Sequence, residues 1–202
     1  MSFWTDSIQN MKDPKRNFRF RVLFTQSDFA GNGTGQTGTG ASQNITGMWY
    51  AKKIQQPSVT ITESSHDFMI HKFYWPAKVE WNEIEMTLVD PVEPNVQANF
   101  LKAIEAAGFV IPGGNNVYKS VSKSSAALKL GNVLIQQIDD AGSNLGEWRL
   151  QHAWAKEISF SDLDYGSEDL MEVTLKMRYD WAEYTPFVNG AGGTPIFQPK
   201  QS

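Results

Sequence analysis

The chain has 202 residues, no cysteine and a formal net charge of −4, from 18 basic and 22 acidic residues. This length suffices for one domain that buries its own core, and the lack of cysteine excludes disulfides and thiolate metal sites. The mildly acidic balance disfavours non-specific nucleic-acid binding, because such binding needs clustered lysine and arginine to neutralise phosphates.

The first element in chain order is a polar, irregular stretch that we interpret as an N-terminal arm, residues 1–16. It lacks a basic region followed by an apolar one, so we expect no secretory signal. No later run reaches the ~18 apolar residues of a membrane helix, so we expect no membrane anchor. From Asn17 to Phe24 apolar and polar residues alternate, which predicts the first strand of a domain spanning 17–184.

Residues 28–47 are rich in glycine, threonine, serine and asparagine, a composition that predicts a flexible loop. A phosphate-binding loop needs a helix start after it, whereas Met48–Ile54 is predicted to be a strand and no Gly-Lys-Ser/Thr follows. A disordered or contact-making loop is therefore the favoured interpretation. Its spaced glycines are Gly31, Gly33, Gly35, Gly38 and Gly40.

The middle of the chain is predicted to contain four strands, Met48–Ile54, Ser58–Ile61, His66–Tyr74 and Lys78–Val89. Pro57 separates the first two, and Asp90-Pro91 ends the last because proline cannot continue a central ladder. A helix is predicted over Pro94–Ala107, with Gly108 at the position of a left-handed cap. Its apolar face is Val96, Phe100, Leu101, Ile104 and Ala107.

The closing third has the clearest pattern. Residues 117–129 fit either a short helix or a loop, and Asn132–Ile138 is predicted to be a strand.

Two long alternating runs follow, Glu147–Phe160 and Leu170–Trp181, and we predict that they pair as a hairpin. The candidate core face of the second run is Val173, Leu175, Met177, Tyr179 and Trp181. Its opposite face, Glu172, Thr174, Lys176 and Arg178, is expected to meet water or a partner, and residues 185–202 are interpreted as a C-terminal arm.

These elements add up to about seven strands and one packed α-helix. The predicted fold class is mainly β, an antiparallel β-sandwich or barrel with the helix covering one end or edge.

Candidate sites for catalysis or metal binding are weak. His66 and His71 are five residues apart, which places two strand residues on opposite faces and disfavours shared metal ligation. The acidic turn at residues 162–169 has ligand-type residues for calcium, but not the spacing of a helix–loop–helix calcium site, and hairpin turns favour the same residues. Glu83 and Glu85 could suggest glycoside chemistry, although solvated strand faces commonly carry such pairs. We expect no cofactor and no enzymatic activity.

The closing strand also resembles a known family. The segment Trp148–Tyr184, which ends in Tyr179-Asp180-Trp181, is similar to the C-terminal hairpin of tail tube proteins of contractile-tailed phages of the T-even type. The order of elements, a strand over Trp81–Val89 followed by a helix over Pro94–Ala107, is similar as well. The resemblance covers about 150 residues, from Asn17 to Tyr184 without the glycine-rich loop, and no single motif in it is diagnostic.

The resemblance implies a structural subunit that forms stacked hexameric rings, the inner tube of a contractile tail, through which DNA passes without sequence-specific binding. It implies the sheath, the baseplate tube initiator and the tail terminator as partners, a location in the virion tail and assembly in the host cytoplasm. The face with Lys176 and Arg178 then lines the lumen or an assembly contact. The glycine-rich loop is a candidate contact between rings.

Two alternatives stay open at this stage. A secretion or injection particle related to the type VI tube (hemolysin-coregulated) proteins would need a similar subunit. A carbohydrate- or calcium-binding β-sandwich module would use exposed tryptophans as sugar platforms. The seven tryptophans and twelve phenylalanines fit a core, but aromatic residues are also enriched at protein interfaces.

Overall fold

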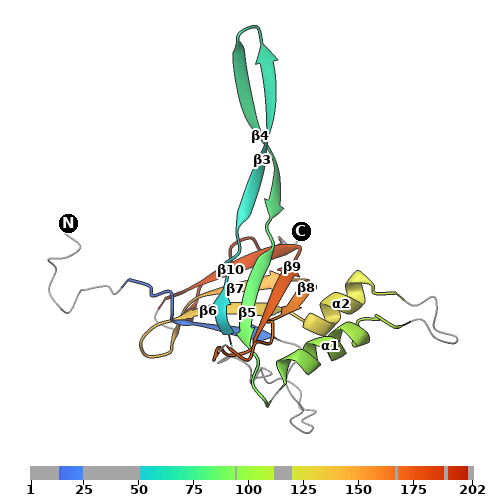
Figure 1. Ribbon diagram of the computed structural model, residues 1–202. Coiled ribbons are helices and arrows are strands. Elements are labelled where there is room, and N and C mark those ends of the chain that lie inside the picture. Colours follow the sequence, from blue (N-terminus) through green and yellow to red (C-terminus); the bar gives the residue numbers. More distant parts are fainter. Residues whose placement is uncertain are drawn as a thin grey trace, which may run out of the picture.

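The computed structural model describes residues 14–24, 51–93, 95–111, 120–166, 168–188 and 191–199. In these residues eleven strands and two helices form a two-layer sandwich with a long hairpin projecting from it (Figure 1). The mainly β, antiparallel fold class is confirmed. The glycine-rich loop at 28–47 and most of the predicted N-terminal arm lie outside the described residues.

Two antiparallel sheets make up the body. The first, in spatial order, contains β1 (Phe20–Phe24), β6 (Val133–Ile138), β7 (Asn144–Gln151), β10 (Trp181–Val188) and β11 (Ala191–Gly192). The second, in spatial order, contains β2 (Ala51–Ile54), β5 (Ile84–Val89), β9 (Glu172–Arg178) and β8 (Trp154–Phe160). Among the described residues no strand pairing joins the two sheets into a closed barrel, so the architecture is a sandwich.

The core lies between the two sheets. In β9 every second side chain is buried, and each pairs with a buried residue of β5, such as Leu175 with Met86. The first sheet contributes Val133, Ile135 and Leu150 to the same cluster. Alternate burial is the consequence of the two-residue period of a strand, which places successive side chains on opposite faces.

The two long runs predicted for the closing third pair with each other, since β8 pairs with β9 and β7 with β10. Each run is nevertheless divided between the two sheets, which the prediction did not include. The chain passes from β7 to β8 at His152–Ala153 and from β9 to β10 at Tyr179–Asp180. His152 has a left-handed backbone, with φ of 55°, which turns the chain without a glycine. The Asp180 amide donates to the Gln151 carbonyl at 3.1 Å and joins the two corners.

The hairpin consists of β3 (Val59–Phe68) and β4 (His71–Trp81), which pair with each other. This differs from the prediction, in which residues 66–74 formed a single strand. The turn is at Met69–Ile70, where Met69 has a φ of 55°. Tight hairpin turns usually contain glycine or asparagine, and neither is present here, so composition gave no sign of this turn.

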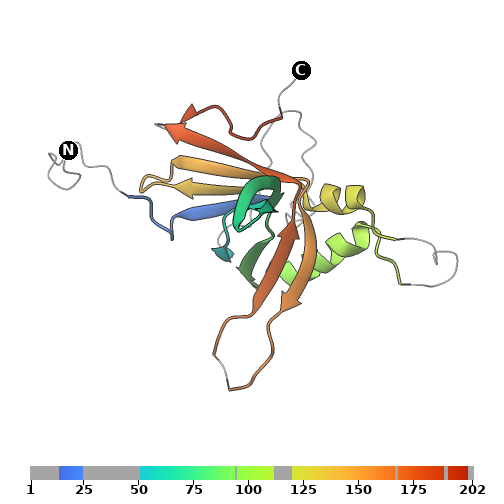
Figure 2. The same cartoon turned by 90° about the horizontal axis from the view of Figure 1, so that it is seen from above.

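Two helices lie side by side at one edge of the sandwich (Figures 1 and 2). Helix α1 (Val96–Ala106) begins at Asn95, whose side chain accepts from the Ala98 amide at 2.6 Å. Helix α2 (Lys123–Leu130) shows that most of the segment 117–129, predicted as either a short helix or a loop, is helical. No described helix is long and apolar enough to span a membrane. Most of the predicted apolar face of α1 packs inward, but Leu101 is exposed.

Candidate assembly surfaces

The β3–β4 hairpin exposes more large apolar side chains than any comparable length of the described chain. Met69 and Ile70 at its tip are 88% and 93% exposed. A two-stranded hairpin is at best marginally stable in water, because stability requires a third strand or a packed face. The described residues supply neither along most of its length, so this hairpin is a candidate assembly surface.

The outer half of the hairpin has one aromatic side. The register pairs Ser64 with Trp75 and His66 with Phe73, which places alternate residues of both strands on a common face. Ring contacts along this face join Phe73 to Trp75 at 6.1 Å and His66 to Trp75 at 6.3 Å. We call this face the distal patch, which consists of His66, Phe68, His71, Phe73 and Trp75.

The opposite side of the outer half is polar. It carries Asp67 and Lys72 as a cross-strand pair, and the Lys72 ammonium lies 5.8 Å from the centre of the Tyr74 ring. The outer hairpin is therefore amphipathic, with an aromatic face and a charged face. This difference between the two faces allows them to be tested separately.

Near the body the apolar side of the hairpin changes. The register moves by two residues in β3, from Ile61 to Glu63, and by three in β4, from Val79 to Pro76. This β-bulge adds one residue to β4, and bulges increase the local twist of a ribbon. Below it the apolar side chains form a separate proximal patch, which consists of Val59, Ile61, Val79 and Trp81.

The base of the hairpin is held by a polar clamp and an aromatic cluster. The Asn82 amide nitrogen donates to the Ser58 hydroxyl and to the Thr60 hydroxyl, both at 3.0 Å. The Trp81 ring contacts Tyr179 of the body at 5.9 Å and stands edge-on to Phe197 at 5.6 Å. A ring near the C-terminus thus packs against the base of the hairpin.

The segment after β10 returns along that strand. Ile196 and Tyr184 exchange two backbone hydrogen bonds, of 2.7 and 3.2 Å, which positions Phe197 on Trp81. Residues 191–199 therefore pack on the domain, and β10 extends past the predicted domain end at Tyr184. The hydroxyl of Tyr179 in this cluster is buried with no hydrogen-bond partner in the described structure, and burial raises its pKa to about 12.

Replacing Phe197 with alanine is expected to loosen the hairpin without unfolding the body, because it removes one of the two rings that contact Trp81. The chain has no native cysteine, so spin labels at Asp67→Cys and Ser159→Cys can report the distance from hairpin to body. We expect a broader distance distribution in the Phe197→Ala protein. Phe68→Ala is the matched control, since Phe68 and Phe197 are 57% and 61% exposed, and an unchanged distribution in Phe197→Ala would contradict this role.

The second candidate surface is the outer face of the β2-β5-β9-β8 sheet. The structure places the four predicted residues Glu172, Thr174, Lys176 and Arg178 together there, opposite the buried side chains of β9. Ion pairs connect the strands across this face, both between neighbours and from β2 over β5 to β9. Lys52 of β2 pairs with Glu172, Lys176 with Glu157 of β8 at 3.0 Å, and Arg178 with Glu83 beside β5 at 3.5 Å.

The ion pairs on this outer face shift the pKa values of the groups that form them. The hydrogen bond from Lys156 lowers the pKa of Glu83, and the hydrogen bond from Lys176 lowers the pKa of Glu157. The Glu157 carboxylate in turn raises the pKa of Lys176. Both signs of charge alternate across the face and neutralise one another, so it attracts neither a polyanion nor a polycation strongly.

Of the five residues predicted for the core of the closing strand, Val173, Leu175, Met177 and Tyr179 are buried. Trp181 is half-buried, because it begins β10 in the other sheet. Its indole nitrogen donates to Glu183 at 3.2 Å. The five glycines predicted to contact a neighbouring ring lie outside the described residues.

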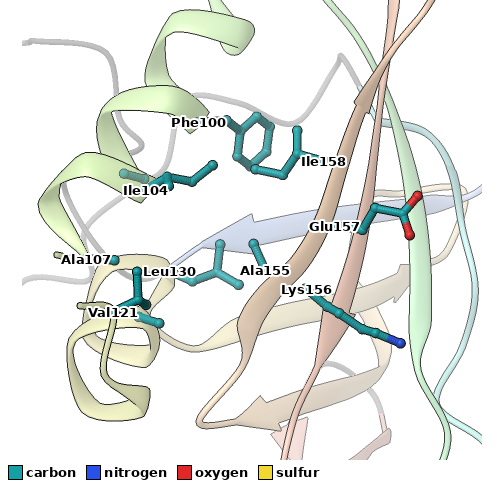
Figure 3. Close-up of a pocket in the computed structure, with 11 residues that line it drawn as sticks. Phe100, Ile104, Ala107, Val121, Leu130, Ala155, Lys156, Glu157 and Ile158 are labelled. Carbon is teal, nitrogen blue, oxygen red and sulfur yellow. The ribbon is translucent and has the colours of Figure 1, made fainter. Parts of the chain in front are cut away.

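A small cavity of about 220 Å³ lies between α1, α2 and β8 (Figure 3). Its walls are apolar, and the charged ends of Lys156 and Glu157 point away from it. Ligand pockets are usually larger, about 300–1,000 Å³, and combine apolar walls with a few convergent polar groups. This cavity therefore does not provide the hydrogen bonds that a sugar requires. The described residues also contain no cluster of three or more metal-ligating side chains.

Sequence reasoning missed the hairpin as a surface, although its aromatic residues were recognised as possible interface residues. The available signal is the run His71, Phe73 and Trp75 at spacing two in a segment bounded by polar residues. Such a run predicts a strand with an aromatic face. It does not say whether the subunit itself covers that face.

Comparison with known proteins identifies solved structures with a similar fold. No family model and no curated protein matches the chain. Among solved structures, a chain of the PVC sheath–tube complex, an extracellular contractile injection system, aligns with a TM-score of 0.59 at 13% identity, covering 91% of this chain and 100% of that one. A chain of the anti-feeding prophage tube-terminating cap gives 0.58 at 13% identity, with 93% and 100% covered.

A third similar chain belongs to the six-fold symmetrised anti-feeding prophage baseplate, with a TM-score of 0.55 at 17% identity and coverage of 86% and 97%. All three likenesses extend over nearly the whole of the other chain. The resemblance to tube proteins drawn from the closing strands is thus confirmed at the level of the fold.

Proposed function

We propose that this chain is the structural subunit of the inner tube of a contractile phage tail. In this proposal six copies close into a ring, rings stack into a hollow tube, and DNA passes through the lumen into the host. The observation that carries the proposal is the β3–β4 hairpin, which projects from the body with exposed aromatic and apolar side chains. Such a surface is expected where another chain covers it.

Stacking follows from the asymmetry of the subunit. The hairpin extends from one side of the sandwich, and in the proposed tube the next copy receives it through a different surface. Contacts between unlike surfaces do not close on themselves when they repeat along an axis, and they generate a fibre. The distal and proximal patches give such a contact apolar area on both sides of the ribbon.

The outer face of the four-stranded sheet is proposed as the wall of the lumen. Its alternating charges are paired across strands, including Lys176 with Glu157 and Arg178 with Glu83. A wall of this kind binds DNA weakly, which a conduit requires. The open edges at β2 and β8 would pair with neighbouring copies in the ring, which removes exposed edges.

Partners and location follow from the same proposal. The tube would contact a sheath, a baseplate initiator and a terminator, and it would lie in the virion tail after assembly in the host cytoplasm. The glycine-rich loop, Gly31–Gly40, is proposed as a further contact between rings. The role is architectural, with no catalytic step.

Electron microscopy of the purified protein tests the proposal. We expect six-fold rings or rods, and sedimentation that shifts to larger species as concentration rises, because ring closure and stacking both depend on concentration. A protein that stays monomeric over the whole accessible concentration range would contradict a tube role.

A tube subunit of an injection particle without a capsid is the second candidate. It is favoured by the likeness to chains of two extracellular injection assemblies. Particles isolated from the native source separate the two cases, since a phage tail is attached to a DNA-filled capsid.

A further inference from the structure

Among the described residues, strand β1 lies at an edge of the five-stranded sheet. It pairs with β6 on one side, from Phe20 opposite Gln137 to Phe24 opposite Val133, and it ends the strand order on the other. An open edge offers unpaired backbone groups to another chain. The chain that leads into this edge is unusual in composition, since residues 14–21 contain four cations and no acid, namely Lys15, Arg16, Arg19 and Arg21.

Local contacts orient these cations. Lys15 donates to the Gln137 side chain at 3.2 Å and to the Tyr184 hydroxyl at 3.3 Å, and Arg21 donates to Asn144 at 2.8 Å. The acceptors of Lys15 and Arg21 are neutral, so these bonds orient the two side chains without neutralising their charge. Phe18 is 74% exposed among them, with the Arg19 guanidinium 5.6 Å from its ring. We call residues 14–21 the basic approach.

Arg21 also donates to the Gln136 side chain at 2.5 Å, and Gln136 in turn donates to the buried Glu147. The Glu147 carboxylate forms an ion pair with Arg149 at 3.6 Å. The acid nearest to the inner end of the basic approach therefore has its own cation. The outer cations, Lys15 and Arg16, are exposed to solvent.

A surface of opposite character is formed by the β8–β9 turn, residues 161–171. This segment contains four acids and no cation, namely Asp162, Asp164, Glu168 and Asp169. Leu163 is 82% exposed and Tyr165 is fully exposed. Beside the turn lies a hollow of about 700 Å³, which is lined by the turn itself, by Val89 and by the ion-paired Lys52 and Glu172.

The two surfaces lie on different sides of the subunit. Viewed along the hairpin, the turn projects from the end of β8 and β9, and β1 lies at another side of the body (Figure 2). One copy therefore presents both surfaces to different neighbours. A contact between unlike surfaces of identical chains is heterologous, and it generates a ring when the rotation closes.

We propose that the β8–β9 turn of one copy docks on the basic approach of the next copy and forms a second lateral contact of the ring, besides the pairing of the β2 and β8 edges. The acidic turn then faces the basic approach, and Phe18 enters the hollow beside the turn. The contact rests on the proposed ring-forming function and identifies which surfaces meet. Charge complementarity of this kind selects the partner surface and its register.

A simpler explanation of the basic approach is protection of the β1 edge, because charged residues on an edge strand prevent unwanted pairing. The two explanations differ in the sign of the charge. Edge protection works with either sign, whereas docking on an acidic turn requires positive charge. Reversal of charge therefore separates them.

The test uses two reversals of exposed residues in the full chain. The first is Lys15→Glu with Arg16→Glu, and the second is Asp162→Lys with Glu168→Lys. Each alone is expected to weaken ring formation at least about a hundredfold, because like charges face each other across the contact. A 1:1 mixture of the two proteins, or both reversals in one chain, is expected to restore rings, since every contact then joins opposite charges. A ring of six allows the two proteins to alternate.

The matched control is Glu105→Lys with Asp140→Lys, which changes the net charge as the second reversal does but at exposed positions outside both surfaces. It should form rings like the parent protein. Ring formation is measured by sedimentation and electron microscopy, and circular dichroism verifies folding of each variant.

If the parent protein forms rings and the single reversals leave them intact, this docking is wrong and the tube proposal stands. Reversals that abolish rings with no rescue in the mixture would also overturn it. A parent protein that never associates would remove both proposals.

Discussion

Shortening the β3–β4 hairpin is expected to abolish the stacking of rings and leave the body of the subunit folded. The change replaces residues 66–73 with Asn-Gly, so that Ser65 and Tyr74, which already pair, flank a two-residue turn. Asn-Gly is favoured in such turns because both positions require a positive φ. The deletion removes the exposed tip and most of the distal patch.

The physical reason is that the removed residues have almost no contact with the body. Their burial in an assembly would contribute roughly 25 cal/mol for each Å² of apolar surface covered, and each ring junction would repeat this contribution six times. Loss of the hairpin end removes this favourable free energy from the stacking of rings. It leaves the core between the sheets untouched, so the melting temperature of the body should stay nearly unchanged.

Two double substitutions test whether stacking depends on the apolar face of the hairpin or only on its length. Phe73→Ser with Trp75→Ser removes aromatic rings from the distal patch and is expected to prevent rods. Asp67→Ser with Lys72→Ser alters the opposite face of the same strands and is expected to leave rods intact. Electron microscopy and light scattering measure both. Rods of normal length from the shortened hairpin would refute a stacking role.

The second large effect is expected from Leu175→Ala in β9. Leu175 is fully buried and pairs with Met86 on one side and Ile158 on the other. Truncation of a buried leucine costs about 2–5 kcal/mol, since it loses apolar contact and leaves a cavity. For a chain of this size that loss lowers the melting temperature by about 4–20 °C.

The control for this substitution is Thr174→Ala, one residue earlier on the opposite face of the same strand. It should change the free energy of unfolding by less than about 0.5 kcal/mol. Urea denaturation of dilute, unassembled protein measures both values. Equal effects of the two substitutions would contradict the assigned burial of β9.

The strand phase of β9 was predictable because alternation directly reports a half-buried face. Val173, Leu175 and Met177 could not move to the other face without exposing the whole set, so the sequence constrains them strongly. Helix α1 was equally predictable, from its 3.6-residue pattern and from Gly108 at its end, where φ is 110°. In these elements one local pattern has one structural solution.

The corners and the hairpin turn were not predictable in this way. His152 adopts a left-handed backbone although it is not glycine, and Tyr179-Asp180 continues the alternation of the strand before it. Met69-Ile70 likewise has no turn composition. At the corner a tertiary contact accompanies the unexpected backbone, the approach of His152 Nδ1 to the Asp180 carboxylate at 3.0 Å. Met69-Ile70 lies at the exposed tip, where its position is set by the pairing of β3 with β4.

The candidate surfaces were also predictable only in part. The shared face of Glu172 to Arg178 followed from period two, but their partners on β2 and β8 depend on strand order, which the sequence does not state. Phe73 and Trp75 were countable as aromatic residues, but their exposure depends on the absence of a third strand beside the hairpin in the described structure.

The double passage of the backbone between the sheets has a mechanical consequence. At His152–Ala153 and Tyr179–Asp180 two adjacent segments cross from one layer to the other, so the layers are joined by covalent bonds as well as by side-chain packing. A force that tries to slide one layer over the other must stretch these crossings. We therefore expect the two layers of the subunit to move as one unit under such a force.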